Sequence, residues 1–444
     1  MTIPPFGYRI MPTITDLPDE LLDEITHLLP KGTLFSLCTV SNRFQPRATR
    51  WLYRSLALAG NGETIKICKA LISNKIAATS VRKVLLWPGL AFSRLSLTGG
   101  PFYLYLSAFY KLLSRALACA INVENIRLMF PYCGASLSFD ACAFSNLHSF
   151  ATTMEPHTLA SFVRRHPQLQ ELHISPSDIR SITLSEFSGI SLSSLNSVCL
   201  PQSLLFIISP DAPLRSVLSP EIEDDNEEIP HFIRHLSRYS TTLTELHLCR
   251  PHWNAEVLMH VATLLPKIKS FTFTRMTPGL HDPANVAFLE ACETALPFFS
   301  SLSQFRIEVS RNRELAGFTF VSDYRCDFTM VRTWGNKCPT LSICAFPSGT
   351  AWHRIEDNVW MPDLHHKAAI RWFFEAASTD QFPIDVMGSL QLFCDSMGKV
   401  DTLGLLNFRS PSAMESIGLY HQTEEDESEV YSSDSDEDDV EIEE

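Results

Sequence analysis

The sequence lacks several features that would assign it to a common class of protein. Its 12 cysteines include no CxxC pair, so we expect free thiols in a reducing compartment. Its 17 Gly and 27 Pro are too few for a collagen-like or linker-dominated chain of 444 residues. At 45% hydrophobic residues it is too apolar to be disordered throughout. This length allows two or three domains or one extended repeat array.

Long apolar runs are also missing. No window of 18 uncharged apolar residues occurs, and Val198–Ser209 is too short to cross a bilayer and contains Pro201. The first residues, Met1–Pro5, show no basic segment followed by an apolar core, so we expect no signal peptide. We therefore expect a soluble protein in the cytoplasm and/or nucleus, without a membrane partner.

Positive charge is scarce. The chain has 36 Lys+Arg against 50 Asp+Glu, and residues 421–444 hold 13 acidic residues and no Lys or Arg, so the remainder is nearly neutral. A neutral body argues against general nucleic-acid binding. The acidic segment is too polar to fold, and Ser433 and Ser435 suit an acidophilic kinase. It is either a solubilising tail or an arm that recruits a basic partner.

Motifs for chemistry are absent as well. The sequence contains no GxGxxG, GxxxxGK[ST], GxSxG or HExxH pattern. His231 and His235 have a spacing that could bind a metal from a helix, but no third ligand accompanies them. We expect no catalytic residue, no cofactor and no metal, and hence no enzyme.

The most informative segment is near the start. Between residues 17 and 29, an ideal helix places six apolar residues on one side and the polar residues on the other; the six are Leu17, Leu21, Leu22, Ile25, Leu28 and Leu29. Pro18 fits only the first turn, and Pro30 ends the helix. Thr33 is the predicted cap of a second helix and Ser41 that of a third.

This pattern resembles an F-box of the fungal family. The resemblance is carried by Leu17-Pro18-Asp19-Glu20-Leu21-Leu22, Ile25, Leu28, Leu34, Leu37, Val40-Ser41, Phe44 and Leu52-Tyr53-Arg54-Ser55-Leu56. It covers about a tenth of the chain. One departure is Pro46, which predicts that the third helix starts after it or kinks there. The segment Cys338–Trp352 also resembles the late repeats of fungal F-box proteins.

The resemblance implies docking onto the Skp adaptor, and through it a cullin, of a Skp–cullin–F-box ubiquitin ligase. The residues it assigns to the F-box core and the adaptor interface are Leu17, Pro18, Leu21, Leu22, Ile25, Leu28, Leu34, Leu37 and Val40. The wide apolar arc of the first helix agrees with two contacts, one internal and one external. The alternative is a three-helix cap that covers a larger domain.

Beyond residue 60 a Leu-x-x-Leu-x-Leu pattern recurs, which is typical of repeat arrays. Copies start at residues 123, 147, 169, 195, 243 and 268, with Leu214–Val217 as a weak copy in the longest gap. Further predicted strands are Val81–Leu86, Leu302–Ile307, Leu341–Phe346 and Val400–Leu405. Predicted helices between or after the strands are His157–Arg165, Ile229–Tyr239, Ala255–Leu265, Val286–Leu296, Lys367–Ala377 and Asp385–Met397.

This α/β alternation predicts an irregular leucine-rich-repeat solenoid, with a generic doubly wound α/β domain as the alternative. The concave face of a solenoid binds partners, and the candidate residues on it are Glu171, His173, Glu245, His247, Lys269, Thr272 and Arg306. They could equally be ordinary exposed strand residues.

The predicted organisation has four parts: a flexible leader (1–12), an F-box (13–58), a repeat array with a C-terminal cap that packs Trp372 and Phe373 inward (59–420), and a disordered acidic tail (421–444). We expect a substrate-recognition subunit of the ligase, which holds an unknown target protein through the repeats. The alternative is a non-degradative interaction scaffold with a vestigial F-box.

Overall fold

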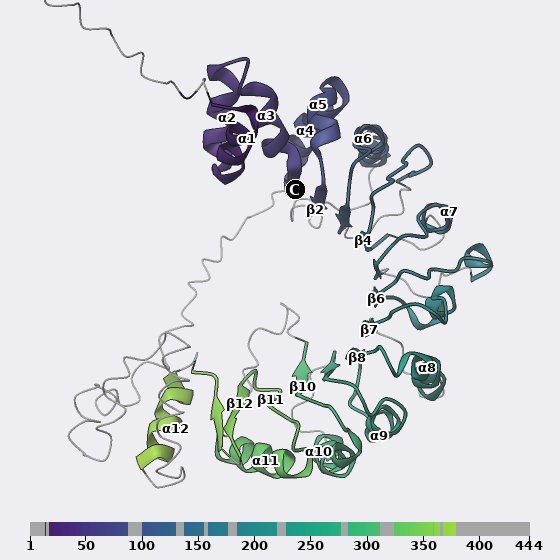
Figure 1. Ribbon diagram of the computed structural model, residues 1–444. Helices are drawn as coiled ribbons and strands as arrows, with labels where there is room; N and C mark the ends of the chain where they lie inside the picture. Colours follow the sequence, from purple (N-terminus) through teal and green to yellow (C-terminus); the bar gives the residue numbers. More distant parts are fainter. Residues whose placement is uncertain are drawn as a thin grey trace, which may run out of the picture. The chain divides into compact units, whose positions relative to one another are not determined.

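The computed structural model describes residues 14, 17–87, 100–129, 137–154, 159–175, 184–219, 228–276, 283–310, 324–357, 359–364 and 367–378. The chain divides into two compact units, Met1–Pro278 and Gly279–Glu444, coloured from purple to green in Figure 1. The predicted strand Val400–Leu405, the predicted helix Asp385–Met397, the leader and the acidic tail lie outside the described residues.

The first unit opens with three short helices, α1 (Asp19–Leu28), α2 (Lys31–Val40) and α3 (Gln45–Arg54). Helix α1 begins directly after Pro18, as predicted. Helix α2 begins after Pro30, earlier than the predicted cap at Thr33. Helix α3 follows Phe44 rather than a Ser41 cap, and Pro46 lies in its first turn, where a missing N–H removes no helical hydrogen bond. The prediction that α3 starts after Pro46 is therefore wrong.

Nine strands of the first unit pair in parallel and in the order of the sequence. They are β1 (Ser55–Leu58), β2 (Lys83–Leu86), β3 (Asn125–Leu128), β4 (Ser149–Thr152), β5 (Glu171–Ile174), β6 (Ser197–Cys199), β7 (Ser216–Ser219), β8 (Glu245–Arg250) and β9 (Ser270–Arg275). In most of them, buried and more exposed side chains alternate along the strand; in β2, Val84 and Leu86 are buried while Lys83 and Leu85 are exposed. Strand β1 was not predicted.

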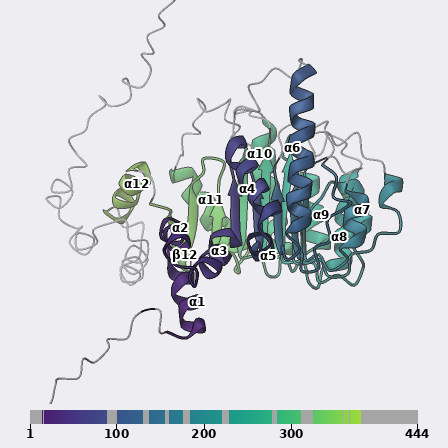
Figure 2. The same ribbon diagram turned by 90° about the horizontal axis from the view of Figure 1, so that it is seen from above.

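The connecting helices of this unit lie on one side of the strand row (Figure 1) and stand alongside the strands when seen from above (Figure 2). They are α4 (Asn61–Ser73), α5 (Lys75–Ser80), α6 (Gly100–Cys119), α7 (Ala160–Arg165), η4 (Leu184–Phe187), η5 (Gln202–Ile207), α8 (Glu228–Leu236), η6 (Ser237–Tyr239) and α9 (Ala255–Leu264). A doubly wound sheet has helices on both faces and a reversal of strand order. The unit is instead a repeat solenoid, as predicted.

Within the described residues, each predicted repeat starts two residues before its strand. The leading apolar residue belongs to the preceding turn: the N–H of Leu169 donates to the carbonyl of His166 at 3.2 Å, and that of Leu243 donates to Tyr239 at 2.8 Å. Both leucines are buried. The repeated leucine therefore anchors the turn in the core, and the strand begins after it.

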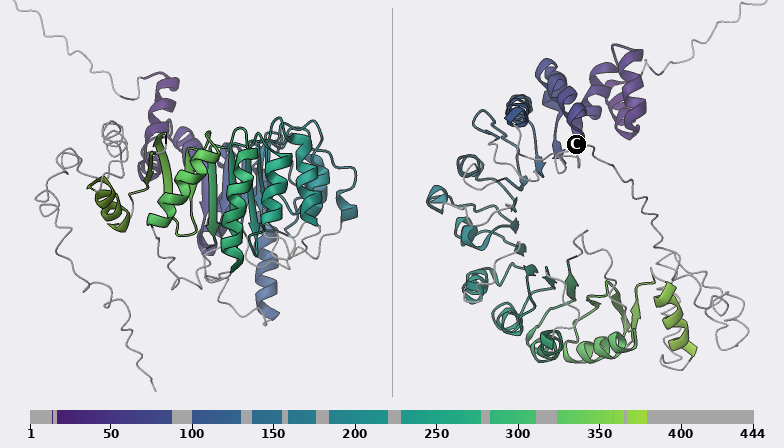
Figure 3. Two further views of the ribbon diagram at one scale, coloured as in Figure 1. Left: turned by 90° about the horizontal axis from the view of Figure 1, so that it is seen from below. Right: turned by 180° about the vertical axis from the view of Figure 1, so that it is seen from behind.

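The second unit contains α10 (Pro283–Ala295), η7 (Leu296–Phe298), β10 (Gln304–Val309), α11 (Tyr324–Lys337), β11 (Ile343–Ala345), β12 (Ala351–Glu356), β13 (Val359–Pro362) and α12 (Lys367–Ser378). Strands β10 and β11 are parallel, whereas β11–β12 and β12–β13 are antiparallel. Helices α10 and α11 cover one side of these strands (Figure 3). The hairpin β12–β13 was not predicted, because all four residues of β13 are buried and show no alternation.

Aromatic residues fill the core of the second unit. Trp334, Trp352 and Trp360 are fully buried. Gly335 permits this packing, since a Cβ at that position would lie 2.8 Å from Cζ2 of Trp360. The prediction that Trp372 and Phe373 pack inward is confirmed, because both are buried.

Candidate docking surfaces

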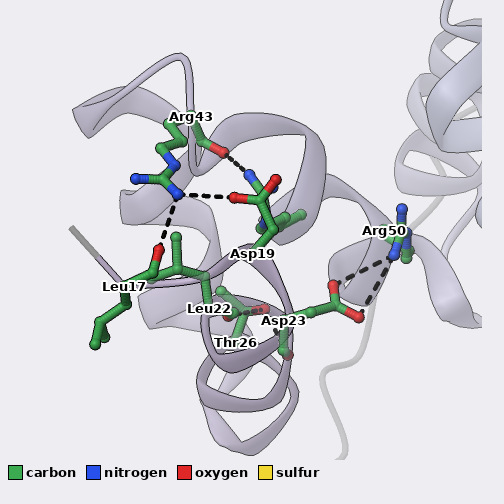
Figure 4. A network of polar contacts seen from close by, with 8 residues as sticks. Leu17, Asp19, Leu22, Asp23, Thr26, Arg43 and Arg50 are labelled. Atoms are coloured by element: carbon green, nitrogen blue, oxygen red, sulfur yellow. Dashed lines mark hydrogen bonds and ion pairs between the residues drawn. The ribbon is translucent and has the colours of Figure 1, made fainter. Parts of the chain in front are cut away.

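An ion-pair cluster joins α1 to the start of α3 (Figure 4). Arg43 donates from Nη2 to Oδ1 of Asp19 at 2.8 Å and to the carbonyl of Leu17 at 2.9 Å. Arg47 makes a second ion pair with Asp19. The hydrogen bond from Arg43, with the positive charges of Arg47 and Arg43, lowers the pKa of Asp19 below its usual value. The first turn of α1 is therefore fixed to the helix that follows α2.

A second contact joins the same helices one turn later. Nε1 of Trp51 donates to Oδ1 of Asp23 at 3.3 Å, and Arg50 lies 3.4 Å from the same carboxylate. The ring of Trp51 also packs on His27, with centroids 4.2 Å apart. Asp19 and Asp23, which we placed on the polar side of α1, thus face α3.

The buried side of α1 is narrower than its apolar arc. Leu22 and Thr26 are fully buried, and the Thr26 hydroxyl donates to the Leu22 carbonyl at 2.9 Å. Leu34 from α2 and Phe44 join this small core. Thr26 was assigned to the polar side from the helical angles, but its hydroxyl is satisfied within the helix and can be buried at little cost.

Five large apolar side chains of α1 and α2 are open to solvent. Their exposed fractions are 46% for Leu21, 36% for Ile25, 81% for Leu28, 66% for Phe35 and 71% for Val40. We call these five residues the apolar helix face. Leu21, Ile25 and Leu28 lie within a narrow arc of α1 at helical spacing, and exposed apolar side chains that share one side of a helix mark an interaction surface more often than isolated ones do.

The predicted adaptor residues therefore separate into three groups. Leu22 and Leu34 are core residues and cannot touch a partner, whereas Leu17 and Leu37 are half-buried. The exposed members are Pro18, Leu21, Ile25, Leu28 and Val40. Phe35 is exposed beside them but was left out of the predicted set; its position next to Leu34 was the available signal, since neighbours in a helix point about 100° apart.

The inner face of the β1–β9 sheet carries two cross-strand rows. By strand register, the first row contains Ser55, Lys83, Asn125, Ser149, Glu171, Ser197, Ser216, Glu245 and Ser270, and the second contains Ala57, Leu85, Arg127, Ala151, His173, Cys199, Leu218, His247 and Thr272. We call this surface the inner sheet face. It is mostly polar or small.

Five of the seven predicted recognition residues lie in these rows. Glu171 and His173 are on β5, whereas Glu245, His247 and Thr272 are on β8 and β9, with His247 directly opposite Thr272. Strands β6 and β7 separate the two groups. Lys269 immediately precedes β9 and is exposed.

The seventh predicted residue, Arg306, lies on β10 in the second unit, with Nη1 3.8 Å from Oε1 of Glu308.

Glu171 and His173 on β5 both interact with neighbouring side chains. Ser149 donates to Oε2 of Glu171 at 2.7 Å. Burial lowers the pKa of His173, opposed by the nearby Glu171 carboxylate and assisted by the Arg127 cation. His173 is thus a neutral, half-buried side chain near pH 7, suited to hydrogen bonding.

Two other possible sites are separate from these surfaces. His231 is exposed on α8 and His235 is half-buried there, and burial lowers the pKa of His235. Across the described residues, no group of three or more His, Cys, Asp or Glu side chains could hold a metal ion. A groove of about 830 Å³ beside α6 is lined in part by Tyr110, Lys111 and Arg115, and none of the predicted site residues lines it.

Comparisons with known proteins do not assign the chain to a family. No family model matches the chain, and no curated protein matches it. The chain is similar to a solved structure, the leucine-rich repeat-containing protein LegL7 from Legionella pneumophila, at 14% sequence identity over 80% of this chain and 93% of that chain, with a TM-score of 0.33. Among the described helices, none is long and apolar enough to span a membrane.

Proposed function

We propose that the chain is the substrate-recognition subunit of a Skp–cullin–F-box ubiquitin ligase. In this proposal α1–α3 form the F-box and dock onto the Skp adaptor, and through it onto a cullin. The repeats hold a target protein. The chain itself supplies no chemistry; it raises the effective concentration of the target near the ubiquitin-charged enzyme.

The observation that carries the proposal is the apolar helix face. If α1–α3 were only a cap over the solenoid, their apolar residues would pack against the downstream repeats. Leu21, Leu28 and Phe35 instead remain between 46% and 81% exposed. Burying such side chains against a partner contributes about 25 cal/mol for each Å² removed from water, so a protein that covers this face gains binding energy.

A mostly polar inner sheet face fits the second half of the proposal. Concave faces of solenoids bind protein partners, and Glu245 and His247 present charge and hydrogen-bonding groups there. Such a face suits a partner that is bound reversibly, because non-obligate interfaces are about as polar as ordinary surface. The nearly neutral charge of the chain outside its acidic tail also agrees with a protein target rather than nucleic acid.

The test is co-purification of the full chain with a Skp adaptor. Leu21→Glu and Ile25→Glu place charges in the centre of the apolar helix face, and we expect each to reduce recovery of the adaptor at least tenfold. Phe206→Glu is the matched control: Phe206 is 46% exposed, as is Leu21, but lies on η5. It should leave recovery unchanged.

Three outcomes decide between the alternatives. Loss of the adaptor in the α1 variants only supports the ligase proposal. Equal loss in all three variants points to general destabilisation and contradicts a docking role for this face. If the unmodified chain binds no adaptor but still captures a protein through its repeats, it is an interaction scaffold with a vestigial F-box.

A further inference from the structure

Two adjacent strands bring a thiol, an imidazole and a hydroxyl together on the inner sheet face. His247 and Cys249 are two residues apart on β8, so both side chains project from the same face. Sγ of Cys249 lies 3.5 Å from Nε2 of His247. Oγ1 of Thr274, which pairs with Cys249 across the strands, lies 2.8 Å from the same nitrogen.

We propose that Cys249 is a nucleophilic thiol, activated by His247, and a site of covalent modification by soft electrophiles such as α,β-unsaturated carbonyl compounds. This inference is independent of the proposed ligase function. Side chains two positions apart lie on the same side of the backbone in a strand but not in a helix, so the strand conformation of β8 is what brings His247 and Cys249 together.

The distances suit proton transfer from sulfur to nitrogen. The thiolate is the nucleophilic form of cysteine, and a neighbouring imidazole favours it. In the tautomer with its proton on Nδ1, the lone pair on Nε2 of His247 can accept the proton of the Cys249 thiol at 3.5 Å, and the Thr274 hydroxyl at 2.8 Å is the competing donor. The sulfur then forms a bond to the β-carbon of the electrophile, and the π electrons of the double bond move to the α-carbon. The α-carbon takes the proton that His247 removed, so no oxidant or leaving group is required.

Cys199 provides an internal comparison. It lies on the same face, in β6, with its Sγ 3.2 Å from Oγ of Ser175. Burial raises the pKa of Cys199, and a neutral hydroxyl is not a base near pH 7. Cys249 is more exposed than Cys199 and has an imidazole where Cys199 has a hydroxyl. The two thiols should therefore differ sharply in reactivity.

The experiment is a time course of the folded full chain with N-ethylmaleimide at pH 7, with each cysteine followed by peptide mass spectrometry. Exposed Cys119 gives the reference rate. An ordinary thiol is only a few per cent ionised at this pH, so activation should make Cys249 react about ten times faster than Cys119. Cys199 should react more slowly than both Cys249 and Cys119.

Two variants test the role of the imidazole. His247→Gln should reduce the rate at Cys249 about tenfold, to that of Cys119. His173→Gln, which removes the histidine in the same row of β5, should leave the rate unchanged. Increased labelling of Cys199 would reveal that a variant has opened the fold. The ratio of the labelling rates of Cys249 and Cys119 in the unmodified chain tests the proposal without any variant: if Cys249 reacts no faster than Cys119, the proposal is wrong.

Discussion

The apolar helix face and the inner sheet face are both open to solvent in the first unit, but their chemistry is opposite. The former presents Leu21, Leu28 and Phe35, whereas the latter presents serines, glutamates and histidines in register. A polar face is stable in water by itself, but a cluster of large apolar side chains gains free energy when another surface covers it. The proposed function assigns a close-packed contact with the adaptor to the apolar face and a more polar, reversible contact with the target protein to the sheet face.

The largest expected effect separates two neighbours in α1. Leu22→Ala removes a fully buried side chain and should lower the free energy of unfolding by about 2–5 kcal/mol. Leu21→Ala should change it by less than about 0.5 kcal/mol, because the side chain is half exposed. Hydrogen exchange of the α1–α3 amides measures both. Equal destabilisation by the two variants would mean that the apolar helix face belongs to the core.

The next effect extends the comparison to the buried aromatic residues of the second unit. Gly335→Ala would bring a Cβ to 2.8 Å from the ring of Trp360, and overpacking of this kind costs about 1–3 kcal/mol. Chemical denaturation followed by tryptophan fluorescence measures the loss. Gly62→Ala is the matched control, since its Cβ would meet no atom within 4 Å. A stability as high as that of the unmodified chain would contradict the packing described for Trp360.

A smaller effect concerns the attachment of α1 to α3. The pKa of Asp19 is lowered by the hydrogen bond from Arg43. Ionised Asp19 therefore stabilises the fold at pH values above 3.8, the pKa of this carboxyl in the unfolded chain. That contribution is lost as the pH falls through the lower folded pKa. Asp19→Asn should therefore melt earlier than the unmodified chain at pH 7, and the two melting curves should converge in acid. A difference independent of pH would show that the ion pair is not its cause.

The smallest effect is expected on the inner sheet face. Glu245 is exposed on β8, so Glu245→Gln should change the free energy of unfolding by no more than about 0.5 kcal/mol. Thermal denaturation provides the measurement. A loss larger than that of Leu21→Ala would mean that the polar row stabilises the sheet and is not simply available to a partner.

Sequence reasoning located most of the strands because each repeat buries a leucine in the turn before its strand. Leu169 and Leu243 follow this pattern closely. It missed β1, whose residues were included in the F-box resemblance, and both strands of the β12–β13 hairpin; the complete burial of β13 removes the alternation that reveals a half-exposed strand.

The candidate sites were only partly predictable. Helical angles identified the apolar arc of α1 but not which of its leucines are buried, since Asp19 and Asp23 of the polar side pair with Arg43 and Arg50 at α3 while Leu21 and Leu28 remain exposed. The proximity of Cys249 to His247 depends on side-chain orientation within β8. Strand alternation predicts which face of the sheet a residue such as Arg306 occupies, but it does not predict that residue's neighbours in space.

The junction between α3 and β1 has a mechanical consequence. Helix α3 ends at Arg54 and β1 starts at Ser55, and the carbonyl of Arg54 accepts a hydrogen bond from the N–H of Arg82 at 2.9 Å. No linker separates the two elements. If one protein binds α1 and α2 and another binds the strands, as proposed, the orientation of the first relative to the second would be fixed. The distance between the two bound proteins would depend on the number of strands between their binding sites, up to about 40 Å along nine strands at the usual strand spacing.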